Sequence, residues 1–357
     1  MKTNIRRLPD SELELMQIIW QQEVPVSRAD IEQQVRTHHV LAPTTILTLL
    51  TRLCEKGFLA VEKQGRANLY TPLITQREYE EKRAAARKKL VDVASAMCGE
   101  DVPENAVLVG IGGRYEWKNK GIDVFIDALD KLNRTDFKGK SVHAFIMIPS
   151  GHNGPDKQLL SKLAGNPSGY VTRTTHYLMN PEYDAVTCRL NALNFNNALG
   201  DKVKVYFVPS YLNGNDGVFN MSYYDLLVGL DLTIFPSYYE PWGYTPLESL
   251  AFRVPTLTTT LAGFGLWVRT YYGKKHPGIT VLDRTDSNYH EVVDGVAARV
   301  AEIAALRKDS KKKYMQNAKE VSEIALWENQ IVYYKEAYSK ALEKLISVAG
   351  TYPTTRT

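Results

Sequence analysis

The spacing of apolar residues changes along the chain and divides it into three stretches. Up to residue 58, apolar positions recur at helical spacing in three short segments, and two alternating runs follow at residues 58–62 and 67–72. Residues 75–96 contain no Gly or Pro and are rich in strong helix formers, which predicts one continuous helix of about 20 residues. From residue 107 onward, apolar runs of strand length alternate with amphipathic segments, as in a parallel sheet covered by helices.

Local signals in the first stretch predict a winged helix. Ser11 and Ser27 are suited to cap two helices, and Pro43 suits the first position of a third. The two alternating runs are joined by a turn with one glycine and two cations, a hairpin signal. The outward face of the third helix suits the DNA major groove, and the hairpin cations suit phosphates. These candidate DNA contacts are Thr44, Thr45, Thr48, Arg52, Lys63 and Arg66.

Charge alone does not decide what this first part binds. Residues 1–79 contain ten Lys and Arg against nine Asp and Glu, a net charge of +1. The whole chain carries +4, too little to indicate a nucleic-acid partner by itself. DNA binding would therefore depend on where the cations lie. A small helical module that binds protein remains the alternative.

Two strand-to-loop junctions in the last stretch carry candidate chemistry. An apolar run at residues 230–235 is followed by a Gly- and Pro-containing turn and a helix expected at 247–252, with Glu240 and Glu248 flanking the turn. Such a junction forms an anion site, because N–H groups and the helix dipole point at one spot. A strand at 107–111 leads into a loop with Arg114 and Lys120, cations that suit a diphosphate.

The strand count extends this interpretation to a doubly wound sheet. Further strands are expected at residues 142–148, 203–209, 254–260 and 279–282. Ligands of parallel α/β sheets bind at the carboxyl ends of the strands. Both candidate junctions lie at such ends. From the residues alone, a buried acidic pair with only a structural role is the alternative.

The residues at these junctions resemble a known family. The sequence Y-Y-E-P-W-G-Y-T-P-L-E at 238–248 resembles the E-x7-E element of retaining GT-B glycosyltransferases, in wording close to animal and fungal glycogen synthases. The loop G-R-Y-E-W-K-N-K-G at 113–121 resembles their matching loop. The resemblance implies a Rossmann-like α/β half of a GT-B fold that binds UDP-glucose or ADP-glucose, or UDP or ADP, and requires no cofactor or metal. By that match, the donor-side catalytic residues are Glu240, Arg114 and Lys120, and the nucleotide-sugar contacts are Arg114, Lys120, Tyr211, Gly243, Tyr244, Thr245 and Glu248.

The first stretch resembles a different family. A-P-T-T-I-L-T-L-L-T-R-L-C-E-K-G-F at 42–58, followed by E-K-Q-G-R-A-N-L-Y-T-P-L-I, is similar to penicillinase repressors, which are dimers that bind palindromic operators. The likeness is expected to span Leu8 to Tyr79. Nothing after Tyr79 resembles the dimerisation segment of that family, so native dimerisation is expected to be absent.

These observations predict a multi-domain chain, with a winged helix-turn-helix joined by a continuous helix to the Rossmann-like half. The expected parts are a DNA-binding domain at 1–79, a shared helix at 80–98, a nucleotide-sugar-binding domain at 99–347 and a mobile tail at 348–357. From residue 80 the helix resembles the one that precedes the second domain of glycogen synthases. Because the two resemblances meet without a gap, they indicate an engineered fusion. A natural gene fusion is the alternative.

Three hypotheses for function follow from these parts. The first is an engineered fusion in which a truncated synthase domain is a rigid carrier or crystallisation partner for the repressor head. The second is a natural regulator that responds to a nucleotide sugar, and the third is a glycosyltransferase with an added DNA-binding module. The first catalytic domain of the synthases, with the acceptor site, has no counterpart in these residues, so inefficient or no glucan synthesis is expected.

Composition indicates the cellular compartment in which the protein is expected. The three cysteines, Cys54, Cys98 and Cys188, are far apart and odd in number, which excludes a disulfide scaffold and fits a reducing compartment. No apolar run approaches the length of about 18 residues that a membrane span requires. The first ten residues do not form a signal peptide. A cytoplasmic protein is expected.

Overall fold

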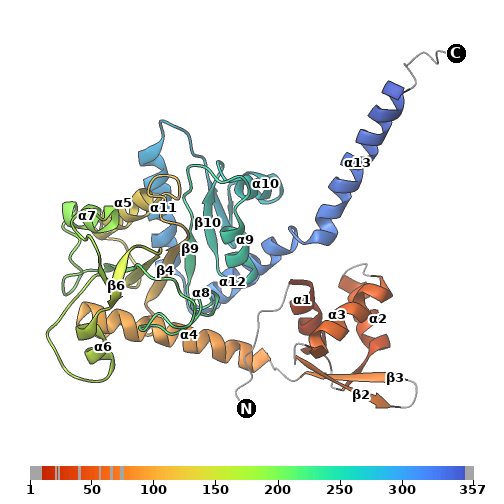
Figure 1. The fold of residues 1–357 in the computed structure, drawn as a ribbon, viewed down its shortest axis with the longest axis horizontal. Coiled ribbons are helices and arrows are strands. Elements are labelled where there is room, and N and C mark those ends of the chain that lie inside the picture. The colour runs from red at the N-terminus through yellow and green to blue at the C-terminus, as the bar shows by residue number, and fades with distance from the viewer. Residues whose placement is uncertain are drawn as a thin grey trace.

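The computed structural model describes residues 10–20, 22, 25–38, 42–55, 58–64, 67–72 and 76–349. Residues 10–72 form a small unit, called here the head (Figure 1). A three-stranded antiparallel sheet has the order β1-β3-β2. Its elements, in the order typical of a winged helix, are α1 (Asp10–Trp20), β1 (Val26–Ser27), α2 (Arg28–His38), α3 (Pro43–Glu55), β2 (Leu59–Gln64) and β3 (Ala67–Pro72).

Local sequence explains the head closely. Ser27 donates to the Asp30 carboxylate through its hydroxyl at 2.6 Å, and the Asp30 N–H donates back to the Ser27 hydroxyl at 3.3 Å. This reciprocal cap starts α2 where the sequence predicts it. The predicted inner face of α3, Ile46, Leu49, Leu50 and Leu53, is buried. Strand β1 was not predicted, because two residues carry no periodicity.

Residues 76–349, called here the body, contain a seven-stranded sheet with the order β11-β12-β10-β9-β4-β5-β8. All neighbours are parallel except β11 and β12, so the sheet is mixed at one edge. The predicted strands are found: β12 has the expected bounds, β5 and β8 are one residue shorter, β9 and β10 are three residues shorter, and β4 is one residue longer. Their bounds are β4 (Val107–Gly112), β5 (Val142–Met147), β8 (Val203–Val208), β9 (Leu232–Ile234), β10 (Thr256–Thr259), β11 (Lys275–His276) and β12 (Ile279–Leu282).

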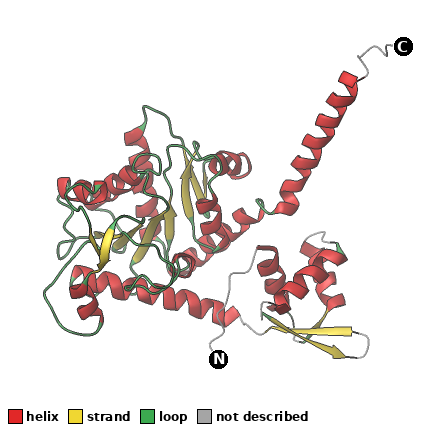
Figure 2. Cartoon of the chain, viewed as in Figure 1, coloured by secondary structure: helices red, strands yellow, loops and turns green. Residues whose placement is uncertain are grey.

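Helices cover both faces of this sheet (Figure 2). On one face the core joins α5 and α11 to the sheet, and on the other it joins α4 and α8. A third cluster packs α9, α10 and α12 near β12. The bounds are α4 (Gln76–Cys98), α5 (Ile122–Asn133), α8 (Tyr223–Leu227), α9 (Tyr244–Ala251), α10 (Gly263–Tyr272), α11 (Tyr289–Ala305) and α12 (Lys308–Glu323).

Between β5 and β8 the chain forms short elements that were expected to be loop or had no assignment. A two-stranded antiparallel hairpin pairs His152 with Leu178 and Pro155 with His176. His152 therefore lies in a strand. These elements are β6 (His152–Pro155), α6 (Lys157–Leu163), β7 (His176–Leu178) and α7 (Ala185–Ala192).

Helix α4 packs as part of the body. It is uninterrupted from Gln76 to Cys98, and its buried residues Leu90, Val93 and Met97 belong to the same core as β4, β5 and β8. The head has its own core, to which no described residue of α4 contributes. The expected start of the helix at Thr75, and the step from β3 to α4, lie outside the described residues. A continuous helical joint between head and body therefore stays a prediction.

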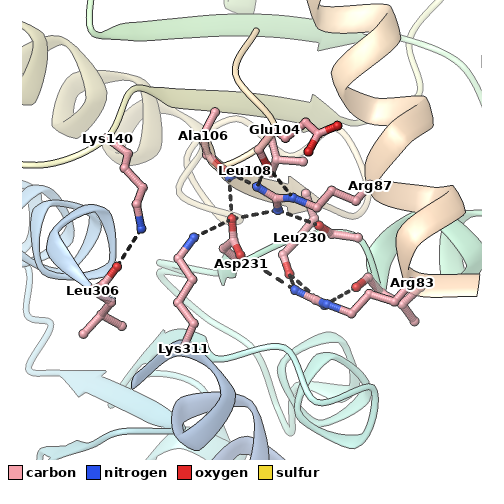
Figure 3. A network of polar contacts seen from close by, with 12 residues as sticks. Arg83, Arg87, Glu104, Ala106, Leu108, Lys140, Leu230, Asp231, Leu306 and Lys311 are labelled. Atoms are coloured by element: carbon pink, nitrogen blue, oxygen red, sulfur yellow. Dashed lines mark hydrogen bonds and ion pairs between the residues drawn. The ribbon is translucent and has the colours of Figure 1, made fainter. Parts of the chain in front are cut away.

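A polar network fixes α4 to the start of β9 (Figure 3). Arg87 contacts the Asp231 carboxylate at 3.0 Å and the carbonyls of Glu104 and Ala106, while Arg83 donates to the carbonyls of Val228 and Leu230. Lys311 of α12 reaches the same carboxylate at 3.2 Å. The segment before β9 can approach α4 this closely because Gly229 has no side chain. A Cβ there would lie 2.8 Å from the backbone nitrogen of Arg87.

The buried Asp231 is ionised in this network. Burial by itself would raise its pKa, but Arg87, Lys311 and Arg83, with the Leu108 N–H, hold the pKa of Asp231 below its ordinary value. Burial lowers the pKa of Lys311, and the nearby Asp231 opposes that shift. One carboxylate thus binds three cations from two helices and stabilises the attachment of α4 only while it is charged.

The last helix, α13 (Trp327–Ala349), presents large apolar side chains to solvent. Val332, Tyr334, Tyr338 and Leu342 are each at least 49% exposed. The helix continues two residues into the segment expected as a tail, and residues 350–357 lie outside the described ones. None of the described helices is long and apolar enough to cross a membrane.

Candidate nucleotide-sugar site and DNA-binding face

The strand order creates a switch point between β4 and β9. From β4 the chain continues through β5 and β8 on one side, and it returns through β9, β10 and β12 on the other. In such doubly wound sheets, ligands bind outside the carboxyl ends of the strands where the order reverses. The loops that leave the two strands there are residues 113–121 and 235–243. They carry the predicted Arg114, Lys120 and Glu240.

Backbone contacts hold these loops together. Gly121 has φ 67°, and a Cβ there would lie 2.2 Å from the Pro236 carbonyl oxygen, so only glycine fits. The Tyr238 N–H donates to the Asn119 carbonyl at 2.8 Å. On the other side, the Gly263 N–H donates to the Glu240 carbonyl at 3.0 Å, where α10 begins. The loop with Glu240 is thereby fixed between α5 and α10.

Lys120 and Glu240 form a direct ion pair across the switch point. Their side chains are 16% and 23% exposed, so the pair is largely shielded but accessible from one side. An entering phosphate would compete with Glu240 for Lys120 and leave the carboxylate free to accept hydroxyl groups. The structure thus brings together two of the three predicted donor-side residues.

Arg114 does not join that pair. Its guanidinium is 78% exposed and contacts Glu116 at 2.9 Å, while Asn119 donates to the other carboxylate oxygen at 2.6 Å. The Asn119 hydrogen bond, helped by the charges of Arg114 and Lys120, lowers the pKa of Glu116. Glu116 therefore holds Arg114 within the loop that they share with Lys120, outside the Lys120–Glu240 pair, a contact that the sequence analysis did not include.

Four more of the predicted residues lie at the start of α9: Gly243, Tyr244, Thr245 and Glu248. Gly243 has φ 109° and caps a helix that begins at Tyr244, three residues earlier than expected. Tyr244 is exposed, Thr245 is half-buried, and the Glu248 carboxylate accepts from the Tyr224 hydroxyl at 2.9 Å. A Cβ at Gly243 would lie 3.5 Å from the Glu240 Cγ, so α9 begins next to Glu240, and the start of a helix suits an anion.

Two tyrosines near the switch point differ from expectation. Tyr211, predicted at the base, is 75% exposed in the loop after β8, and none of its described contacts links it to Lys120 or Glu240. Tyr223 packs against Gly112 at the end of β4, and its buried hydroxyl has no hydrogen-bond partner among the described residues. Burial, followed by the charge of Glu248, raises the pKa of Tyr223. Its only sequence signal is a tyrosine pair at the start of a short helix.

The head presents the expected face of α3. Thr44, Thr45, Thr48 and Arg52 are all exposed on the side opposite the buried leucines. The Thr48 hydroxyl donates to the Thr44 carbonyl at 2.9 Å, so one hydroxyl is engaged within the helix. Lys63 is exposed near the end of β2, and Arg66 lies outside the described residues. In the described part of the chain, no three His, Cys, Asp or Glu side chains cluster as metal ligands would.

Comparison with known families gives a different match for each end of the chain. The family model described as glycogen synthase matches residues 97–168 and 162–354. The model described as penicillinase repressor matches residues 8–107. The sequence analysis expected the repressor likeness to end at Tyr79. The match instead continues through α4. The two matches overlap at the end of that helix.

Curated relatives cover the body. Glycogen [starch] synthase isoform 2 of Saccharomyces cerevisiae is 27% identical over 308 residues, which is 68% of this chain and 44% of that protein. The synthase of Neurospora crassa is 25% identical over 310 residues, 71% of this chain and 43% of that protein. The chain thus spans less than half the length of these relatives.

Two solved structures show a likeness to one part of the chain each. The solution structure of the DNA-binding domain of the repressor BlaI is 34% identical and covers 22% of this chain and 93% of that one, with a TM-score of 0.20. WaaG, described as a glycosyltransferase involved in lipopolysaccharide biosynthesis, is 17% identical and covers 70% of this chain and 50% of that one, with a TM-score of 0.35.

Proposed function

This chain belongs to the glycogen synthase family over residues 97–354, and on that premise we propose that its body binds a nucleotide sugar, or the nucleoside diphosphate alone, at the switch point between β4 and β9. The observation that carries the proposal is the Lys120–Glu240 ion pair, shielded between the two loops that meet there. Lys120 neutralises the diphosphate, with Arg114 turning from Glu116 to add a second charge. Glu240 then accepts sugar hydroxyls, and Glu248 accepts those of the ribose.

The head carries a repressor DNA-binding domain, and its proposed partner is operator DNA. The exposed hydroxyls and the one arginine on α3 supply groups that read base edges in the major groove. Lys63 and Arg66 at the hairpin add phosphate contacts. The expected absence of a dimerisation segment rested on a likeness that ends at Tyr79. Because the repressor match includes α4, it removes that support.

The role of the combined chain is a further proposal. The two matches overlap at residues 97–107, from the end of α4 to the start of β4, which supports an engineered fusion that holds the body as a rigid carrier or crystallisation partner for the head. The body is one Rossmann-like sheet with one wall of a donor site. Positioning an acceptor hydroxyl in a second wall is worth about 7–11 kcal/mol of the barrier, so we propose nucleotide-sugar binding without efficient glucan synthesis.

A natural regulator is the second candidate, and the network at Asp231 favours it. That network ties α4, which lies next to the head in sequence, to the start of β9, the strand that leads into Glu240. A ligand at the switch point would then alter operator affinity. The carrier proposal instead requires the two binding events to be independent.

Calorimetry of the whole chain tests the nucleotide site. UDP and ADP are titrated separately, and the tighter ligand identifies the base. Replacing Lys120 by Ala should weaken binding of that nucleotide roughly tenfold or more, because a charge-assisted contact is lost. Lys131→Ala, which removes an exposed cation paired with Asp294, is the control and should leave the affinity unchanged. Equal affinities for both variants would contradict the site.

Gel-shift titration with a palindromic operator duplex of the kind that penicillinase repressors bind tests the head. Arg52→Ala should weaken binding roughly tenfold, while Arg36→Ala on α2, also exposed, serves as the matched control. Repeating the titration with saturating UDP or ADP separates the two candidates. Unchanged operator affinity supports the carrier, and a shift supports the regulator. Loss of operator binding in Lys120→Ala would contradict independent modules.

A further inference from the structure

Helix α13 leaves the body and presents an apolar face that is open to solvent over most of its length. Figure 1 shows the helix projecting beyond α12. Its described contacts with the body lie near its start, where the Gln330 side chain donates to the Ile324 carbonyl at 3.1 Å. The Tyr333 hydroxyl lies 2.7 Å from that of Tyr271 on α10. Beyond these contacts, every residue from Val332 to Lys344 is exposed.

The apolar positions of this helix follow a heptad repeat. Steps of four and three residues alternate without a break over three heptads. The row that they form, called here the seam, consists of Trp327, Ile331, Tyr334, Tyr338, Ala341, Leu345 and Val348. An uninterrupted repeat of this kind is typical of a helix that packs along another helix. The seam therefore indicates a helical partner.

The charge of α13 argues against DNA or a lipid surface as that partner. The helix carries three lysines and three glutamates, so its net charge is zero. Phosphate backbones and anionic membranes both select helices with an excess of cations. Lys340 and Glu336 pair with each other at 2.6 Å, on positions outside the seam. The open face therefore suits an apolar partner with little net charge.

A second copy of α13 has these properties. When two copies pair in parallel, each seam residue meets its own counterpart, so aromatic rings pack on aromatic rings. The positions beside the seam are then matched across the pair. Gln330 faces Lys335 of the second copy, and Ala337 faces its Leu342. Neither contact brings like charges together, so α13 is complementary to itself.

The exposed area of the seam is large enough for a dimer. Trp327, Tyr334 and Tyr338 are between 49% and 65% exposed, and Leu342 beside them is 59% exposed. Because a large aromatic side chain covers about 150–250 Å² when fully buried, these four residues hold on the order of 500 Å² per helix. A pair would then bury on the order of 1,000 Å², where specific interfaces begin. The rest of the seam adds to this area.

We propose that the seam of α13 is a dimerisation surface and that its partner is α13 of a second copy of this chain. The pairing depends on neither the proposed nucleotide binding nor the proposed DNA binding, because none of the residues assigned to those sites lies on α13. Each dimer carries two heads and two bodies.

Sedimentation equilibrium of the whole chain over a range of concentrations tests this proposal. The wild type should approach twice the mass of one chain. Tyr338→Lys places a cation at the centre of the seam, and the dissociation constant of the dimer should rise roughly tenfold or more, because two like charges would be buried against each other. Tyr338 is exposed in the single chain and Lys favours helix, so this variant should fold as the wild type does.

Ser339→Lys is the matched control. Ser339 is the next residue along the helix but lies outside the seam, so the same added charge should leave the dissociation constant unchanged. A dimer that Tyr338→Lys leaves intact, or that Ser339→Lys weakens equally, would overturn the proposal.

A wild-type chain that stays monomeric at every concentration would also overturn the proposal. The same holds if that monomer instead sediments with vesicles of phosphatidylcholine and phosphatidylserine, since the seam would then serve a lipid surface. Failure of UDP, ADP or operator DNA to bind would contradict the proposals for those sites and leave dimerisation through α13 standing.

Discussion

At the residue scale, His143 shows how the body's core controls a titratable group. It lies in β5, and its Nδ1 is 2.8 Å from the Tyr206 hydroxyl. Burial, together with the nearby charge of Lys204, lowers the pKa of His143 to about 4. The ring is therefore neutral in the folded protein above about pH 4.

This shift predicts acid sensitivity below pH 6.5. The unfolded chain takes up a proton near pH 6.5, whereas the folded one does so only near pH 4, so protons favour unfolding in that window. Stability is fully present above pH 6.5 and falls by up to about 3 kcal/mol as pH drops to 4. His143→Gln cannot titrate, so its free energy of unfolding in urea should fall less steeply. Parallel slopes for both proteins would contradict the assignment.

Gly121 is a second residue whose effect can be measured. Ala at this position must adopt φ near 67° and place its Cβ against the Pro236 carbonyl oxygen. The free energy of unfolding in urea should fall by about 2 kcal/mol or more, and nucleotide affinity should fall with it, because the two loops separate.

Gly154→Ala provides the control for this prediction. Gly154 has φ 97°, and a Cβ there would meet no atom within 4 Å. This variant carries the conformational cost without the clash. A drop in stability as large as that of Gly121→Ala, or an equal loss of nucleotide affinity, would show that loop contact is not the cause.

At the element scale, the attachment of α4 depends on Asp231. Replacing Asp231 by Asn leaves Arg83, Arg87 and Lys311 without their common counter-charge in a buried place. The body's urea transition at pH 7 should lose about 3 kcal/mol. The matched control is Asp294→Asn, which breaks an exposed pair with Lys131 and should cost less than about 1 kcal/mol.

Acid should remove this difference. Because the folded pKa of Asp231 lies below its ordinary value, the stability that it contributes is present above pH 4 and is lost as pH falls through the folded pKa. Wild type and Asp231→Asn should therefore converge at low pH. A gap that stays constant from pH 7 to acid would mean that Asn fails for reasons of packing, not charge.

Elements with strong periodicity were predictable, and short polar ones were not. Strands β4, β5 and β8 were predicted to within a residue or two, because each is a continuous apolar run. The hairpin of β6 and β7 was missed, since His152 and His176 belong to no apolar pattern. Helix α10 was missed because Gly263 and Gly265 resemble a loop, although close packing of Gly263 on Pro241 and of Gly265 on Thr259 requires small residues there.

The candidate site was predictable as far as its motifs extend along the sequence. Lys120, Glu240 and Glu248 follow from spacing and resemblance, and the structure places them at one switch point. Tyr223 could not be found, because its importance comes from contact with Gly112, which is 111 positions earlier in the chain. Arg114 was expected beside Lys120, but its local partner Glu116 turns it aside.

At the scale of the whole molecule, the described residues form separate cores in head and body. We therefore predict two urea transitions. UDP or ADP at about 100 times its dissociation constant should raise the body's transition by about 2.7 kcal/mol and leave the head's transition alone. The operator duplex should do the reverse. A single transition that both ligands shift would contradict two independent folding units.

The buried face of α4 determines where this protein can be divided. A gene fragment that begins at residue 99, where the expected nucleotide-binding domain starts, would strip Leu90, Val93 and Met97 from beneath the sheet and would delete both arginines that clasp Asp231. Such a fragment would expose the apolar face of the sheet that α4 covers, and we expect it to precipitate. The soluble cut lies ahead of Arg83, so the helix must travel with the larger piece whenever the two are expressed apart.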